Sequence, residues 1–411
     1  MKSSVPRRAH SVARLVLCAL AGCATTLWLP SALAQKKYDP GATDTAIKVG
    51  QTMPYSGPAS AYGTIGKVEA AYFRKLNDEG GVNGRKIDFV SLDDGYSPPK
   101  TVEMTRRLVE QDEVLLMFNQ LGTPSNTAIH KYMNTKKVPQ LFVATGASKW
   151  NDAAGNPWTM GWQPNYQTEA RIYAEYILKT TPNARIGVLY QNDDYGKDYL
   201  KGFKDGLGDK VKQLVAEVSY EVTDATVDSQ ILQLQGAGVD AFFDITTPKF
   251  AAQAIRKAYD VGWKPAHYLN GVSASVGSVL TPAGLDKSVG VISTIYGKDP
   301  TDKQWENDPA MKDWMAFMKK YYPDGSLTDS FNVYGYSVAQ TLVQVFKQCG
   351  DDLTRENVMR QAASLKDFST PMALPGIRIN TSATDYAPIE SMQFVRFDGK
   401  TWVPFGEVMG K

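Results

Sequence analysis

Residues 46–94 read AIKVGQTMPYSGPASAYGTIGKVEAAYFRKLNDEGGVNGRKIDFVSLDD, and this segment contains one complete strand–helix–strand unit. Residues 46–50 have the short apolar pattern of a buried strand, and residues 67–77 place apolar side chains at helical spacing. Gly80-Gly81 ends the predicted helix, and residues 87–92 form the next predicted strand. Strands joined through helices predict a mostly parallel sheet with helices on both faces.

The same alternation continues along the chain and restarts near residue 171. The predicted elements are helix 99–111, strand 114–118, helix 125–134, strand 138–143, helix 171–179, strand 185–190, helix 197–207, strand 211–220, helix 228–234, strand 241–245, helix 250–260, strand 267–269, helix 309–322 with Asp308 as N-cap, helix 337–348 and a hairpin over 392–404. Two α/β runs of similar size predict two doubly wound domains. No long linker separates them, so we expect several short crossings.

The N-terminal segment has the pattern of an export signal. Four basic residues precede an apolar run over 15–29, and the small-x-small sequence at 30–34 predicts cleavage after Ala34. The run is too short for a transmembrane anchor. As an alternative, Leu20-Ala21-Gly22-Cys23 fits a bacterial lipobox, with Cys23 lipidated. We favour a signal peptide over 1–34 and a soluble periplasmic protein.

Charge and cysteine content exclude two classes of protein. Loss of the four positive charges of the leader would take the net charge from +2 to −2, so no basic footprint for nucleic acid is present. Cys18 and Cys23 fall in the leader, which leaves Cys349 without a partner for an internal disulfide. The fold must therefore rest on its hydrophobic core.

The sequence lacks the common enzyme motifs, including a nucleophile elbow, a paired-histidine zinc motif, a Walker loop and a dinucleotide fingerprint. His130 and His267 have no partner at metal-ligand spacing. Cys349 is typical of a packed residue. Asp93-Asp94 after a strand is typical of a turn or cap, although a role in general acid/base chemistry or metal binding is the alternative. We expect no catalysis, no metal and no cofactor.

Several segments, in chain order, resemble one family. They are Ile47-Lys48-Val49-Gly50, Ser56-Gly57-Pro58, Ala61-Tyr62-Gly63, Glu79-Gly80-Gly81-Val82-Asn83-Gly84-Arg85-Lys86-Ile87, Asp93-Asp94, Lys137-Val138-Pro139, Ala144-Thr145, Tyr195-Gly196 and Phe203-Lys204. Together they resemble the branched-chain amino-acid type of periplasmic solute-binding protein, the type I class that serves ABC importers. The resemblance covers nearly all of the chain after the leader.

This resemblance implies an α/β fold with two Rossmann-like lobes, joined by three hinge strands, that hold a ligand between them. Lobe 1 would comprise residues 36–165 and 296–375, and lobe 2 residues 166–295 and 376–411. Ligands of open α/β sheets bind outside the carboxyl ends of the strands, so the loops that follow strands are the candidate site.

The loop after strand 114–118 is a candidate anion site. Thr123 is the predicted N-cap of the next helix with Pro124 at its first position, and Gly122 allows close approach to the backbone. Free N–H groups there would suit a carboxylate, although an ordinary cap facing water is the alternative. The other predicted ligand residues, from strand ends and from the resemblance, are Tyr62, Ala144, Thr145, Gly146, Tyr195, Thr246, Thr247, Ser273, Phe331 and Tyr296.

Departures from the family pattern concern the ligand. Relatives that bind amino acids have a hydroxyl residue where this chain has Gly122, a threonine near Gly146, and an acid near Val272-Ser273 for the ammonium group. A buried ammonium without a carboxylate partner is costly. We therefore predict a carboxylate ligand with an apolar or aromatic body, a class that one branch of this family binds. A shift of the alignment by one or two residues would instead supply the acid through Asp244.

The predicted function is that of a receptor that closes by hinge motion on a small molecule and delivers it to the membrane permease subunits of an ABC transporter. No nucleic-acid partner is expected. Two alternatives stay open: a ligand-sensing regulatory subunit on the same two-lobed fold, and a secreted hydrolase with an unrecognised acid pair.

Overall fold

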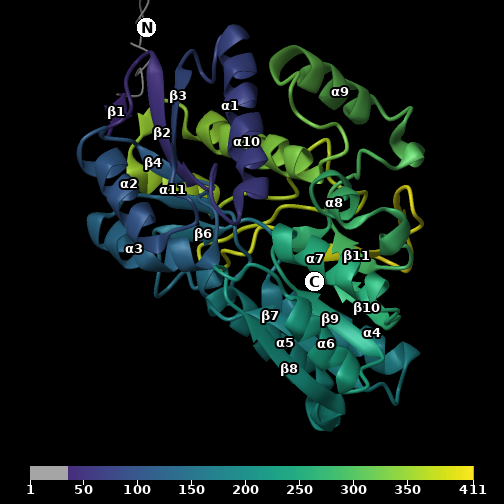
Figure 1. Ribbon diagram of the computed structural model, residues 1–411. Coiled ribbons are helices and arrows are strands. Elements are labelled where there is room, and N and C mark those ends of the chain that lie inside the picture. The colour runs from purple at the N-terminus through teal and green to yellow at the C-terminus, as the bar shows by residue number, and fades with distance from the viewer. Residues whose placement is uncertain (1–35, 411) are drawn as a thin grey trace, which may run out of the picture. The chain divides into compact units, whose positions relative to one another are not determined.

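The computed structural model describes residues 36–410 (Figure 1). The first of its sheets is built from parallel strands. Its strands, in spatial order, are β3 (Lys86–Asp93), β2 (Ala46–Met53), β4 (Leu116–Phe118), β5 (Gln140–Val143) and β6 (Thr159–Gly161). Helices α1 (Gly63–Asp78), α2 (Pro98–Glu110) and α3 (Thr123–Lys136) connect successive strands. Parallel neighbours need such crossovers, as the alternation predicted.

The second sheet has eight strands and combines a parallel part with an antiparallel edge. Its strands, in spatial order, are β14 (Trp402–Pro404), β13 (Ser391–Phe397), β11 (Ile292–Ile295), β10 (Ala266–Leu269), β9 (Ala241–Ile245), β7 (Ile186–Gln191) and β8 (Leu214–Tyr220), with β15 (Met409–Gly410) paired to β13. Its helices are α4 (Tyr166–Thr180), α5 (Asp194–Leu207), α6 (Asp228–Gly236) and α7 (Pro248–Asp260). The predicted terminal hairpin is confirmed as the antiparallel pair of β13 and β14.

The late helices return the chain to the first sheet. They are α8 (Thr281–Ala283), α9 (Pro309–Tyr321), α10 (Ser330–Cys349) and α11 (Arg355–Ala362), and β1 (Lys37–Tyr38) pairs with β12 (Asp352–Leu353). Figure 1 shows yellow-green α10 and α11 among the purple and blue elements of the first sheet. The chain thus passes between the sheets three times: after β6, after β11 and before β13. The predicted α/β fold class is confirmed, whereas the residue boundaries of the lobes stay predictions.

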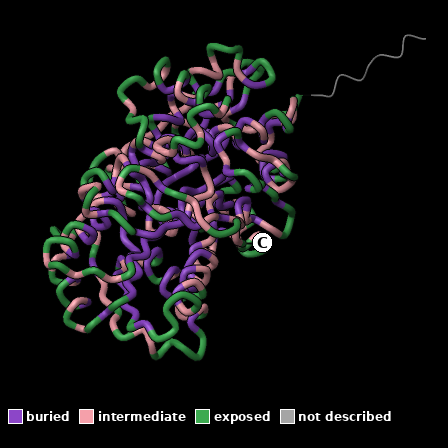
Figure 2. Tube along the Cα trace, turned by 90° about the vertical axis from the view of Figure 1, so that its right-hand side faces the viewer, coloured by how far each residue is buried: buried purple, intermediate pink, exposed green. Residues whose placement is uncertain are grey.

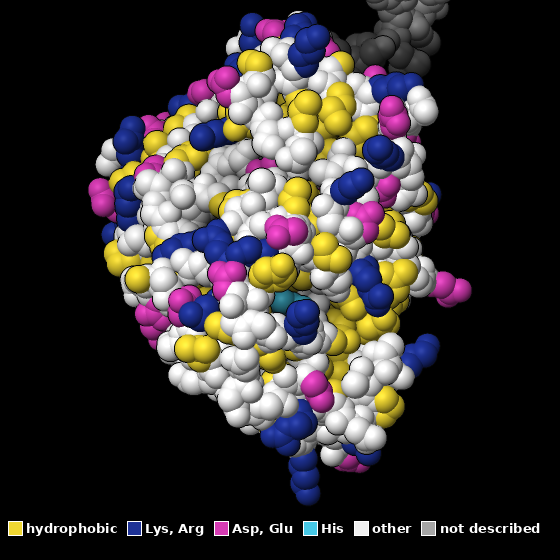
Figure 3. All heavy atoms as spheres, turned by 45° about the vertical axis from the view of Figure 1, so that its right-hand side comes forward, with side chains coloured by type: hydrophobic (Ala, Val, Ile, Leu, Met, Phe, Trp, Pro, Cys, Tyr) yellow, Lys and Arg dark blue, Asp and Glu magenta, His cyan; other side chains and the backbone are white. Residues whose placement is uncertain are grey.

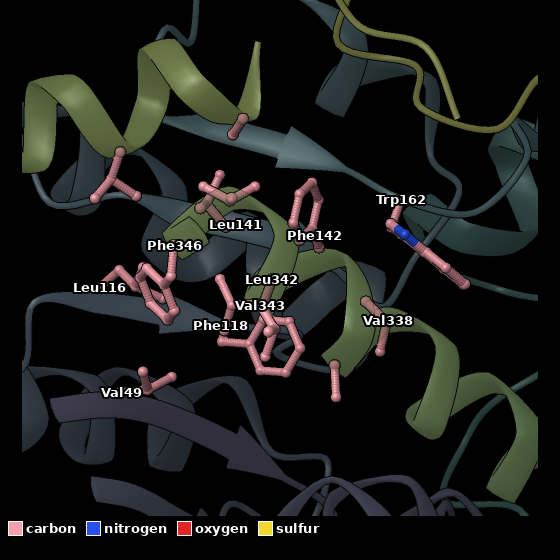
Figure 4. Packing of buried hydrophobic residues seen from close by; sticks show 14 of the residues in the cluster. Val49, Leu116, Phe118, Leu141, Phe142, Trp162, Val338, Leu342, Val343 and Phe346 are labelled. Carbon is pink, nitrogen blue, oxygen red and sulfur yellow. The ribbon is translucent and has the colours of Figure 1, made fainter. Parts of the chain in front are cut away.

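The core of the first sheet explains why α10 packs there. Val338, Leu342 and Phe346 recur every four residues, so they share one face of the helix. Figure 4 shows this face against strand residues such as Phe118 and Leu141, and all of them are buried. Figure 2 shows buried residues inside and exposed residues mainly at the periphery. Burial of side chains of this size contributes about 1.5–3 kcal/mol each.

Several predicted boundaries are wrong; α4, for example, begins at Tyr166 rather than at residue 171, and α1 at Gly63 rather than at residue 67. Helix α10 begins at Ser330 rather than at residue 337, because the Asp329 side chain caps it by accepting a hydrogen bond from the Phe331 N–H at 3.1 Å. Strand β8 begins at Leu214 rather than at residue 211, because the preceding residues form a 3₁₀ turn. The predicted N-cap Asp308 is confirmed, since its carboxylate accepts from the Met311 N–H at 3.0 Å.

The described surface carries mixed charge. On the face in Figure 3, basic and acidic side chains are interspersed, with hydrophobic groups between them. Within residues 36–410, every helix is too short or too polar to span a membrane. The predicted leader, with Cys18 and Cys23, lies outside the described residues.

Candidate functional site

A cavity with about 1130 Å³ of empty space, partly open to solvent, is lined by residues that follow strands of both sheets. The predicted ligand residues in its wall are Tyr62, Gly122, Thr123, Ala144, Tyr195, Thr247 and Phe331, together with Tyr296. Four other predicted residues, Thr145, Gly146, Thr246 and Ser273, lie behind that wall. The fold therefore brings most of the predicted set to one enclosed space.

The start of α3 is a strained and tightly packed part of the wall. The prediction that Thr123 caps this helix is wrong: Gly122 occupies the N-cap position with φ +99°, and α3 begins at Thr123. A Cβ on Gly122 would lie 2.5 Å from Tyr96 Cε2, so glycine is required by backbone and by packing. No side chain caps α3. Because Pro124 has no N–H and the Asn126 N–H already donates to the Gly122 carbonyl, the N–H groups of Thr123 and Ser125 are the ones left for another acceptor. Since both residues are buried, the alternative of a cap facing water does not hold.

Thr145 and Gly146 support the wall from behind. The Thr145 hydroxyl lies 2.6 Å from the Thr123 hydroxyl and accepts a hydrogen bond from Trp150 Nε1 at 3.2 Å. A Cβ on Gly146 would lie 2.2 Å from the Pro164 carbonyl oxygen and 2.7 Å from the Tyr166 ring. Gly146 therefore lets the chain that leaves the first sheet pack closely, and Thr145 fixes Thr123.

Thr246 and Ser273 also lie behind the cavity, where they bond to each other. The Ser273 hydroxyl donates to the Thr246 carbonyl at 2.5 Å, and the Thr246 hydroxyl donates to Asp244 at 2.6 Å. Their neighbour Thr247 does line the cavity and precedes α7. Of the two threonines that follow β9, only Thr247 therefore lines the cavity.

Tyr195 is held rigidly in the first turn of α5. The side chain of the N-cap Asp193 accepts from the Tyr195 N–H at 2.9 Å, which fixes the start of the helix. The Tyr195 hydroxyl lies 2.5 Å from the Asn270 amide oxygen in the orientation of that amide which satisfies its neighbours. A buried ring with an anchored hydroxyl presents a fixed surface to the cavity.

Tyr62 joins the two sides of the cavity. Its hydroxyl donates to the Val272 carbonyl at 3.0 Å, and its ring lies 5.0 Å from the Phe331 ring, centroid to centroid. Phe331 is the second residue of α10 and does not follow a strand, so it reaches the wall for a reason different from the one used to predict it. The two rings form an aromatic contact over the space.

Many wall residues escaped prediction, and the strand-end rule could have found some of them, Tyr96 included. Tyr96 follows β3, has φ +60°, and donates its backbone N–H to the Asp94 carboxylate at 2.9 Å. The predicted structural role of Asp93-Asp94 is thus observed, but Asp94 is buried rather than solvated. Tyr166, the first residue of α4, also lines the cavity and gave no separate signal in the sequence.

Polar groups in the wall are mainly neutral. Burial raises the pKa values of Tyr62, Tyr96 and Tyr195 well above the ordinary value, so these hydroxyls stay protonated at neutral pH. Among the described lining residues, the charged types are Lys298 and Asp299. Lys298 lies 2.8 Å from Asp308. Asp299 Oδ1 accepts from the Thr301 N–H at 2.8 Å, whereas its buried Oδ2 has no hydrogen-bond partner among the described residues.

The groups considered for catalysis have structural environments. Asp244 is fully buried and bonds to His267 Nε2 at 3.0 Å, away from the cavity wall. Burial raises the pKa of the Cys349 thiol to about 12, so it is not a thiolate at neutral pH. Within residues 36–410, no group of three or more acidic, histidine or cysteine side chains has the proximity for a metal ion.

Comparison with known proteins agrees with the geometry. The family model described as periplasmic binding protein matches residues 46–401. The Leu/Ile/Val-binding protein homolog 1 of Brucella suis biovar 1 (strain 1330) is 26% identical over 351 residues, which cover 80% of this chain and 86% of that protein.

Solved structures share the fold at low sequence identity. A branched chain amino acid ABC transporter protein from Thermus thermophilus with bound valine has a TM-score of 0.81 at 15% identity, covering 90% of this chain and 98% of that chain. A fatty acid ABC transporter substrate-binding protein from Thermomonospora curvata has a TM-score of 0.76 at 23% identity, covering 92% and 95%. A solute binding protein of an R. palustris ABC transporter in complex with benzoate has a TM-score of 0.74 at 19% identity, covering 89% and 98%. Because the family model spans most of the sequence and the cavity is lined from two α/β sheets, this chain belongs to the periplasmic binding protein family.

Proposed function

We propose that this protein is the extracytoplasmic receptor of an ABC importer, exported through a leader cleaved after Ala34. It closes on a carboxylate with an apolar or aromatic body and delivers that ligand unchanged to the membrane permease. The observation that carries this proposal is the cavity itself, because Thr123 from one sheet and Tyr195 from the other line the same space.

The charge distribution of the wall supports a ligand without an ammonium group. Asp299 is the acidic side chain among the described lining residues; Thr301 bonds to its Oδ1, while its buried Oδ2 has no hydrogen-bond partner among the described residues. Asp244, the alternative acid, is engaged by His267. Among the described lining residues, an amino acid would therefore have Asp299 Oδ2, near the hinge, as the one acidic partner for its ammonium group, and an ammonium group elsewhere in the cavity would be buried without a carboxylate, which is costly.

The uncapped start of α3 favours a carboxylate at the other end of the cavity. Backbone N–H groups and the helix dipole both stabilise an anion at such a position. Fold neighbours named for a fatty acid and solved with benzoate are in keeping with this ligand class, while another was solved with valine. We place the ligand carboxylate beside Gly122 and Thr123.

Closure depends on hydrogen bonds that join the two predicted lobes. Tyr62 donates to the Val272 carbonyl, and Asp329 accepts from the hydroxyls of Ser275 and Ser278 at 2.8 and 2.6 Å. Contacts made only in the closed form, together with the ligand, would shift the population toward that form. The permease would then recognise the closed arrangement.

Calorimetric titration tests the ligand class. We expect binding of benzoate-like or aliphatic acids and no binding of leucine or valine at the same concentrations. Micromolar binding of leucine or valine, with no binding of the acids, would reject the proposed class. Turnover of a bound acid would instead favour a hydrolase, and an operon without permease and ATPase genes would favour a sensor subunit.

A further inference from the structure

The cavity does not end at the strand-end residues but continues between the segments that cross from one sheet to the other. Six apolar residues of its wall there, which we call the hinge compartment, are Ile295, Val333, Met372, Ile377, Ile379 and Ile389; the polar Ser369 and Thr370 of the same region also line the cavity. Ile295 ends β11, Val333 lies in α10, and the other four belong to the irregular segment between α11 and β13. All six are apolar, and all but Ile295 are buried.

Two small residues keep one side of this compartment open. Gly297 and Ala373 form an antiparallel bridge, and both line the cavity. A Cβ on Gly297 would make only ordinary contacts, 3.5 Å from the Met372 carbonyl oxygen and 3.6 Å from Val333 Cγ1. The absence of bulk at this bridge leaves space beside the isoleucine side chains.

Open apolar space inside a protein calls for an apolar occupant. Interiors are close-packed, and atoms that line a hollow lose their dispersion contacts. Water does not replace these contacts well, because a buried water needs several polar partners. The cavity is lined both by strand-end loops and by the hinge segments, so a ligand that fills it meets more than one group of side chains.

We propose that the hinge compartment holds the extended apolar chain of an amphipathic carboxylate whose carboxylate lies at the start of α3. This inference rests on the proposed function, which supplies the position of the carboxylate. Near the hinge compartment, Lys298 is already paired with Asp308, and the carboxylate of Asp299 would repel that of a bound acid. The polar end of the ligand therefore belongs at α3 and its chain at the isoleucines.

A series of straight-chain acids tests this directly. Calorimetry would compare butanoate, hexanoate, octanoate, decanoate and dodecanoate with benzoate and leucine. Each methylene group that enters the compartment should tighten binding about fourfold, until the compartment is full and the gain stops. We expect the best ligand to be clearly longer than butanoate.

Two variants should move the best chain length in opposite directions. Ala373→Leu fills the compartment and should favour shorter acids, whereas Ile389→Ala enlarges it and should favour longer ones. Ala363→Leu is the matched control, because this half-buried alanine packs against the same hydrophobic core but lies outside the cavity wall. It should leave the best length unchanged.

The outcomes separate this inference from the proposed function. Binding of benzoate or butanoate with no gain along the series would overturn the inference and leave the proposed function standing. Binding of leucine alone, or of none of the acids, would overturn the proposed ligand class as well. Variants that weaken every acid equally would show that the hinge compartment is structural, since damage to folding does not depend on ligand length.

Discussion

The start of α3 and the hinge compartment are two ends of one cavity, yet they are built by different means. At α3, a glycine with φ +99° and an uncapped helix end expose backbone polarity beside rigid tyrosine rings. At the hinge, apolar side chains from three separate segments enclose space. The difference suggests a division of labour, in which backbone N–H groups select the carboxylate and enclosed volume selects the chain.

The largest expected effect is at Gly122, where a substitution would disrupt the α3 end of the cavity. Gly122→Ala should lower the free energy of unfolding by about 2–5 kcal/mol, because backbone strain adds to the clash with Tyr96. Gly80→Ala is the matched control: Gly80 has φ +102° but no atom within 4 Å of an added Cβ. It should lose only about 1–2 kcal/mol in urea unfolding. Equal losses would show that the Tyr96 contact is unimportant.

Tyr195 tests the wall that the second sheet contributes to the α3 end of the cavity. Tyr195→Ala should weaken acid binding by about 1–3 kcal/mol, since a buried anchor contact is lost. Tyr195→Phe keeps the ring and should lose less. Calorimetry on both variants separates ring from hydroxyl, and unchanged affinity in Tyr195→Ala would mean that this wall of the site is misplaced.

Asp299 gives the hinge end of the cavity a pH dependence. Burial raises its pKa to about 6, above the value of about 3.9 in an unfolded chain. Its contribution to stability is therefore full below pH 4 and is lost as the pH rises through 6. Above pH 6, the free energy of unfolding of Asp299→Asn should exceed that of the wild type by roughly 1–3 kcal/mol, and near pH 4 the two should be equal.

Asp93 is the control for the Asp299 experiment, because its pKa is shifted in the opposite direction. Burial alone would raise its pKa, but hydrogen bonds from Ser56 and from the Gly95 N–H hold it at about 2. Asp93→Asn should therefore be less stable than the wild type above pH 4, and the difference should vanish as the pH falls toward 2. Urea unfolding between pH 2 and 8 measures both slopes. Parallel slopes for the two variants would contradict these environments.

The smallest expected effect concerns closure. Ser278→Ala removes one hydrogen bond to Asp329 and should weaken binding by about 0.5–1.5 kcal/mol without a comparable loss of stability. Ser229→Ala is the control, because its exposed hydroxyl bonds only locally to Gln230. Calorimetry with thermal unfolding would show whether Ser278 acts through closure; an equal loss of stability and affinity would argue for a structural role.

The α3 end of the cavity could largely be predicted from the sequence, because its residues directly follow predicted strands. Gly122, Thr123 and Tyr195 lie in the wall for that reason. Side-chain direction could not be predicted: Thr145 and Thr246 lie one or two residues from wall positions but point to hydrogen-bond partners behind them. Period and strand ends give position along the chain, not rotamer.

The hinge compartment had no comparable signal. Met372, Ile377 and Ile389 lie in a segment without regular helix or strand periodicity, so no pattern indicated which side chains would be enclosed. Tyr296, placed near a hinge by the resemblance, was the single indication that the site extends there. Irregular segments acquire their neighbours only through the complete fold.

A crystal structure of the complex with the tightest acid of the series tests the account most directly. We predict one intact acid in the cavity, its carboxylate within hydrogen-bond distance of the α3 backbone N–H groups and its chain against Ile377 and Ile389. A ligand on the outer surface, a chemically altered ligand, or an acid bound with its carboxylate at the isoleucines would contradict it.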